Sequence, residues 1–126
     1  MKNLMIIALC AIATPAAAEL VEIKNCRLQQ VELMPINRVV TCDITNLGQV
    51  PIASMAYRVL IGQVDRTVPW VDKARSAEIA GGIEPGETVP VDLMLVFHLP
   101  DHADQDQLTV AVTAESVSGV DGQPIK

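Results

Sequence analysis

Apolar and polar residues alternate along much of this chain. The alternation is clearest in residues 52–61, 88–97 and 108–115. The expected apolar faces consist of Met55, Tyr57, Val59 and Ile61 in the first stretch, Val89, Val91, Leu93, Leu95 and Phe97 in the second, and Leu108, Val110, Val112 and Ala114 in the third. A period of two is typical of strands that bury one face. These stretches therefore predict three half-buried β-strands.

Shorter strands are expected over residues 28–33, 38–44 and 76–80. Turn-forming sequences separate the expected strands: Asn46-Leu47-Gly48, Gly81-Gly82, Glu84-Pro85-Gly86 and Asp121-Gly122. The longest irregular stretch is expected at residues 62–75, where Pro69 favours a loop or an edge. The pattern predicts an all-β fold, an immunoglobulin-like antiparallel β-sandwich of about seven strands, with a small barrel as the alternative.

The first 18 residues have a different pattern. Lys2 is followed by an apolar run over residues 4–13, and three alanines precede Glu19. This arrangement is typical of a secretory signal peptide, and the apolar run is shorter than the ~20 residues that span a bilayer. We therefore expect a cleaved signal peptide (1–18), a single domain (19–126), and a periplasmic or secreted protein with no transmembrane segment in its mature chain.

Removal of the signal peptide would leave two cysteines, Cys26 and Cys42. An even number of cysteines in an exported protein predicts a disulfide. If the strands on either side of Met34 form a hairpin, the two cysteines lie opposite each other, with their Cβ atoms about 5 Å apart. A catalytic CxxC pair does not fit this spacing, and two cysteines without nearby histidines are too few for zinc.

Two turns carry a resemblance to a known group of domains. Residues 40–52 read Val-Thr-Cys-Asp-Ile-Thr-Asn-Leu-Gly-Gln-Val-Pro-Ile. This run resembles the opening of bacterial FxLYD-type and CARDB-type immunoglobulin-like domains. Residues 83–88, Ile-Glu-Pro-Gly-Glu-Thr, are similar to the Pro-Gly-Glu turn of those domains, although residues 57–61 read Tyr-Arg-Val-Leu-Ile where their Phe-x-Leu-Tyr-Asp motif would fall. The resemblance implies a non-catalytic β-sandwich of the bacterial cell envelope and supplies no functional residues.

Charge and side-chain chemistry favour binding over catalysis. The chain carries 9 Lys and Arg against 15 Asp and Glu, a net charge of −6, which argues against nucleic acid or anionic lipid as a partner. Arg66, Pro69 and Trp70 are the candidate protein contact, because Trp and Arg dominate interface energetics. Alternatively, Trp70 folds back and covers one end of the sandwich.

A second group of side chains suggests metal binding. His98, Asp101 and His102 lie close together in an acidic segment, and imidazole with carboxylate suits zinc or copper. The alternative is a polar loop between strands. We find no nucleophile with a base, no phosphate loop and no cofactor motif, so we expect neither an enzyme nor a cofactor. The leading interpretation is an exported binding or accessory module with a protein partner in the envelope; the alternative is a periplasmic metal-binding protein using His98 and His102.

Overall fold

The computed structural model describes residues 19–31, 34–96, 99 and 103–125. The predicted signal peptide, Phe97 and the candidate metal ligands His98, Asp101 and His102 lie outside these residues. The described part contains six strands: β1 (Val21–Val31), β2 (Met34–Asn46), β3 (Ile52–Gln63), β4 (Val71–Ile83), β5 (Thr88–Val96) and β6 (Leu108–Ser118). A short 3-10 turn, Gln105–Gln107, precedes β6. None of the described residues forms a helix long and apolar enough to cross a membrane.

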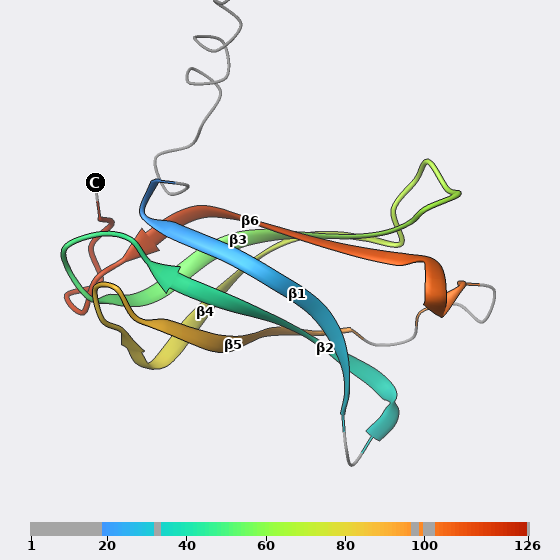
Figure 1. The fold of residues 1–126 in the computed structure, drawn as a ribbon, viewed down its shortest axis with the longest axis horizontal. Coiled ribbons are helices and arrows are strands. Elements are labelled where there is room, and N and C mark those ends of the chain that lie inside the picture. The colour runs from blue at the N-terminus through green and yellow to red at the C-terminus, as the bar shows by residue number, and fades with distance from the viewer. Residues whose placement is uncertain (1–18, 32–33, 97–98, 100–102, 126) are drawn as a thin grey trace, which may run out of the picture.

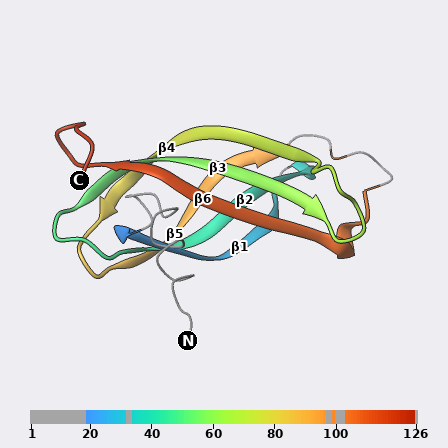
Figure 2. The ribbon, with the colours of Figure 1, turned by 90° about the horizontal axis from the view of Figure 1, so that it is seen from above.

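The six strands form two antiparallel sheets that face each other. Their strand orders are β1-β2-β5 and β4-β3-β6, and Figures 1 and 2 show the two layers. β1 and β6 lie along one side of the sandwich, and β4 and β5 lie along the other. The predicted all-β sandwich is confirmed, with six strands in the described residues against the expected seven or so.

The core lies between the central strands β2 and β3. Met55, Tyr57, Val59 and Ile61 of β3 are buried, as their alternation predicts. The Tyr57 hydroxyl donates a hydrogen bond of 2.7 Å to the carbonyl of Leu93 in the opposite sheet. A buried phenol needs such a partner, so Tyr57 joins the two layers.

The predicted core-facing side of β5 is confirmed for only part of the strand. The pairing of β5 with β2 shifts by one residue between Val40 and Thr41, which leaves Leu93 as an extra residue in β5. A one-residue shift turns every following side chain to the other face. Leu95 is therefore 47% exposed and Val96 only 4% exposed, and the prediction that Leu95 faces the core is wrong.

The stretch 62–75 is more regular than expected. β3 continues through Gln63 and β4 begins at Val71, so the connecting loop covers residues 64–70 only. β4 lies at a sheet edge with β3 as its one strand neighbour, and most of its side chains are exposed. Because an edge strand need not bury a face, its sequence lacks the alternation that revealed the other strands.

The pair Gly81-Gly82 also belongs to β4 and does not form the predicted turn. Both glycines have positive φ, 79° and 67°, and they lie where the pairing with β3 is irregular between Ile52 and Ser54. A Cβ atom at Gly82 would lie 2.9 Å from the carbonyl oxygen of Ile52. Glycine is required here because the backbones approach closely within a bulge.

The N-terminal hairpin has the predicted register near its disulfide. Leu28 pairs with Val40, and Arg27 pairs with Thr41. Cys26 and Cys42 are bonded, with their Cα atoms 4.1 Å apart. Asn25, with φ of 55°, forms a bulge beyond the disulfide. Both the disulfide and the local register predicted from the cysteine spacing are thus confirmed.

Candidate functional site

The loop 64–70 projects from one end of the sandwich, where β3 passes into β4 (Figure 1). Two backbone hydrogen bonds close it. The N–H of Arg66 donates to the backbone carbonyl of Gln63 at 2.9 Å, and the N–H of Trp70 donates to the backbone carbonyl of Ile61 at 2.7 Å. Val64 and Val68 are 69% and 73% exposed. The loop therefore has a fixed base and two exposed valines beside the exposed polar residues 65–67.

Trp70 is held against the base of this loop. Its indole Nε1 donates to Oε1 of Gln63 at 3.0 Å, and the guanidinium of Arg66 lies 4.5 Å from the ring centroid. The ring is half-buried. Arg66 is therefore presented to solvent on an aromatic support, an arrangement that a cation–π interaction stabilises.

Gln63 connects the loop with the rest of the fold. This side chain is almost fully buried. Its amide nitrogen donates to the carboxylate of Asp65 at 2.7 Å, and its carbonyl oxygen also accepts the backbone N–H of Asp104 at 2.9 Å. A single amide thus fixes the indole, the loop and the segment before β6 relative to one another.

A hollow of about 500 Å³ lies beside the loop, on the outer face of the β4-β3-β6 sheet. Its lining comes from the loop and from all three strands: Leu60, Gly62, Gln63, Arg66, Thr67, Pro69, Asp72, Thr109 and Ala111. Gly62 and Ala111 keep the floor low because they carry little or no side chain. Arg66 and Pro69, two of the three predicted contact residues, therefore meet at one concave surface. Trp70 is not part of the lining but packs against the guanidinium of Arg66.

The charged side chains around the hollow differ in whether they are already paired within the protein. The carboxylate of Asp72 accepts two hydrogen bonds from Arg58, of 2.7 and 2.9 Å. These bonds hold the pKa of Asp72 below its ordinary value and raise that of Arg58. Because each charge of this pair is already matched, the guanidinium of Arg66 is the ionic group best placed to meet a ligand.

The described residues show no arrangement suited to metal binding. Within residues 19–31, 34–96, 99 and 103–125, no three His, Cys, Asp or Glu side chains come close enough to hold an ion. Asp92, in the middle of β5, accepts a hydrogen bond of 2.8 Å from the hydroxyl of Thr41. The site combining His98, Asp101 and His102 falls outside the described residues and stays a prediction.

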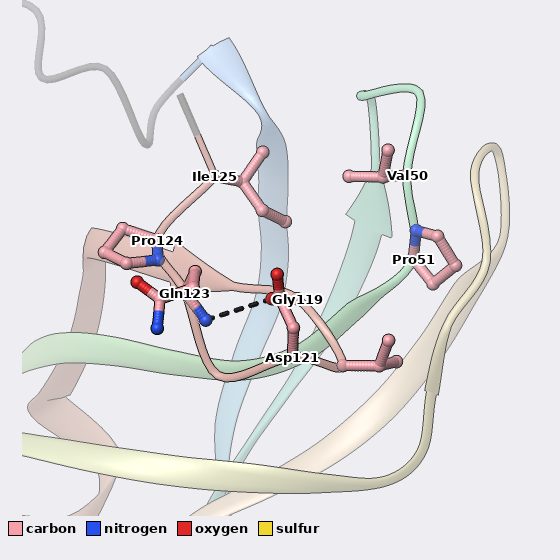
Figure 3. A pocket seen from close by; sticks show the side chains of 8 residues that line it. Val50, Pro51, Gly119, Asp121, Gln123, Pro124 and Ile125 are labelled. Atoms are coloured by element: carbon pink, nitrogen blue, oxygen red, sulfur yellow. Dashed lines mark hydrogen bonds between the residues drawn. The ribbon is translucent and has the colours of Figure 1, made fainter.

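A second, smaller hollow of about 420 Å³ lies at the opposite end of the sandwich (Figure 3). It forms between Val50-Pro51 and the C-terminal segment 119–125. The backbone N–H of Gln123 donates a hydrogen bond of 3.0 Å to the carboxylate of Asp121 and stabilises the turn of this segment. Leu47, Val50 and Val120 are exposed nearby. Local turn signals do not show that these two segments meet, because strand order alone brings them together.

Asn46 organises the turns at that same end. Its buried side-chain amide donates to the carbonyls of Val50 and Ile83, both at 2.8 Å. Its oxygen accepts the N–H of Gly48, also at 2.8 Å. The turn predicted at Asn46-Leu47-Gly48 is confirmed, and its asparagine also anchors the end of β4.

No protein-family model, curated protein or solved structure matches this chain.

Proposed function

We propose that this protein is an exported, non-catalytic binding module that holds a protein partner of the cell envelope. The contact is the surface formed by Val64, Arg66, Val68, Pro69 and Trp70 with the adjoining hollow, here named the loop surface. The observation that carries the proposal is the concave site beside a cation stacked on an indole and flanked by two exposed valines. Arg and Trp are among the residues that contribute most to binding at protein interfaces.

The loop surface is ordered before a partner arrives. The hydrogen bonds of Gln63 fix the indole and tie the loop to the segment before β6. Because a pre-organised loop loses little conformational entropy on binding, more of its contact energy contributes to affinity. This favours a specific partner over non-specific adhesion.

The proposed location rests on two features. The disulfide of Cys26 and Cys42 suits an oxidising compartment, and the sequence of residues 1–18 has the pattern of a secretory signal. The proposed compartment is the periplasm or the medium outside the cell.

Site-specific photo-crosslinking tests the contact. A photoreactive amino acid at Val68 should give one dominant covalent adduct in cells that naturally make the protein. The same group at Val120, an exposed residue of the opposite end, serves as the control and should not give that adduct. Arg66→Ala should abolish the Val68 adduct, since the bonds that close the loop and hold the indole do not use the Arg66 side chain.

Two outcomes would contradict the proposal. Either Val120 captures the same partner as Val68, or the Val68 adduct survives Arg66→Ala at full yield. In both cases the partner would be held elsewhere than at the loop surface.

A further inference from the structure

The edges of the two sheets differ in how they are protected. In the described residues, β1, β4, β5 and β6 each have one strand neighbour within their sheet. A free edge offers unpaired backbone N–H and C=O groups that can pair with another chain. Natural proteins usually block such edges with proline, bulges or inward-pointing charges.

Three of these edges carry such a block. β5 contains Pro90, which has no amide to donate. β1 is interrupted by the bulge at Asn25. In β4, Lys73 and Arg75 pair with the buried residues Val59 and Tyr57 of β3, so both cations project on the core-facing side of an edge strand.

Over residues 108–114, the edge of β6 has no proline, no bulge and no inward-pointing charge. This stretch reads Leu-Thr-Val-Ala-Val-Thr-Ala, without charge, proline or glycine. Its pairing with β3 is regular throughout, because the bulge of β6 lies after Ala114. The chain's own C-terminal segment covers the strand only further on, where Ile125 donates to the carbonyl of Val117 and Pro124 bridges to Ser118.

The exposed stretch of β6 is also palindromic. Residues 109–113 read Thr-Val-Ala-Val-Thr and are the same in both directions about Ala111. In an antiparallel pair of two such strands centred on Ala111, Thr109 faces Thr113, Val110 faces Val112, and Ala111 faces its own copy. Thr–Thr and β-branched pairs are favourable cross-strand contacts.

The side chains are distributed suitably for this pairing. Val110 and Val112 pair with Ile61 and Val59 of β3, on the core-facing side, and both remain half-buried at the edge. A second strand would cover them further. Ala111 lies on the outer face in line with Leu60, where a small residue leaves room for its copy.

We propose that β6 pairs antiparallel with β6 of a second copy of this chain, about a twofold axis at Ala111. The two β4-β3-β6 sheets then join into one continuous sheet of six strands. Because the described residues of each copy offer one such edge, the assembly closes at two copies. Thr109 and Ala111 also line the hollow beside the loop, but the pairing of the two strands does not require a partner protein at the loop surface.

A charge-swap experiment on the mature chain (residues 19–126) tests this pairing by sedimentation velocity over a concentration series. The wild type should shift from one copy to two copies as concentration rises. Ala111→Lys and Ala111→Glu should each remain a single copy, because like charges would lie directly opposite across the axis. An equimolar mixture of the two variants should recover two copies, since Lys then faces Glu.

Ala74 supplies the matched control. It is exposed on the outer face of β4, in the same sheet, and pairs with Arg58. Ala74→Lys should associate as the wild type does. Because Ala111 is itself exposed, its substitution should not impair folding.

Each of four results overturns the proposal. In the first, the wild type stays a single copy up to about 1 mM; in the second, the Ala111→Lys variant still forms two copies. In the third, the mixture of the two variants fails to recover two copies, and in the fourth, assemblies of more than two copies form. The Arg66→Ala variant should leave the mass unchanged, so failure of the loop surface and failure of the β6 pairing are distinguishable.

Discussion

At the scale of single residues, Asn46 shows how one side chain holds an end of the sandwich. Its amide makes three hydrogen bonds, to the backbone of Gly48, Val50 and Ile83. A buried polar group is favourable only when its bonds are made, and its loss leaves each backbone partner unsatisfied. The residue therefore contributes to stability through the turns it connects.

Asn46→Ala should lower the free energy of unfolding by about 2–4 kcal/mol, because three backbone groups lose their partner together. Urea unfolding followed by circular dichroism measures the change. Gln49→Ala, at an exposed position of the same turn, should change stability by less than about 0.5 kcal/mol. Equal effects of the two substitutions would show that the amide is dispensable.

Asp43 is a second residue with a defined electrostatic role. Its carboxylate accepts a hydrogen bond of 3.0 Å from the side chain of Asn25 and lies 3.4 Å from the guanidinium of Arg27. The hydrogen bond from Asn25 and, beyond it, the positive charge of Arg27 lower the pKa of Asp43 below 3.8, against partial desolvation. The ionised form is thus preferred more strongly in the folded chain than in the unfolded one.

This preference gives stability a pH dependence of known sign. A depressed folded pKa contributes stability that is fully present above the unfolded pKa of about 3.9 and is lost as the pH falls through the folded pKa. Urea midpoints from about pH 6 down to about pH 2.5 should therefore fall less steeply for Asp43→Asn than for the wild type. Identical slopes would mean that Asp43 has the same pKa in both states.

At the scale of elements, the N-terminal hairpin depends on its disulfide. β1 is an edge strand, and the bulge at Asn25 interrupts its pairing with β2 next to Cys26. The bond to Cys42, a buried residue of the central strand, crosses this weak point. The disulfide therefore secures an edge strand at the place where its backbone ladder is broken.

Reduction of the disulfide should lower the free energy of unfolding by about 3 kcal/mol, because it releases a loop whose ends are 16 residues apart. Urea unfolding with and without a thiol reductant measures this. The rate of backbone amide hydrogen exchange should increase in β1 more than in β3, which serves as the internal control. An unchanged urea midpoint, with two free thiols demonstrated chemically, would refute this role.

How far the sequence predicts an element depends on where the element lies. β3 is central, its burial alternates from Met55 onward, and the faces of Met55, Tyr57 and Val59 were predictable. β4 lies at an edge, and its length was missed because exposed strands need no apolar face. The face of Leu95 was missed because a bulge at Leu93 is a property of the pairing with β2, which a single strand's sequence does not encode.

At the scale of the whole molecule, the two hollows lie at opposite ends of the sandwich, where strands pass into loops. The chemistry of Arg66, Pro69 and Trp70 predicts a contact, and the fold brings Arg66 and Pro69 together at one hollow. The sequence does not single out Gln63, since its role arises from the indole and from Asp104, which is distant in sequence. The hollow itself depends on Gly62, Thr109 and Ala111 being neighbours in one sheet, so only the folded arrangement shows it.

The single indole of this chain has a practical consequence. Trp70 is the only tryptophan and Tyr57 the only tyrosine, and the two lie in different parts of the molecule. Burial raises the pKa of Tyr57 above its ordinary value of 10.0, although the charge of Arg75 opposes this. Indole fluorescence therefore reports on the loop surface, while alkaline titration of the phenol reports on the separation of the two sheets. The protein thus carries two spectroscopic probes without any label, one at its proposed contact and one in its interior.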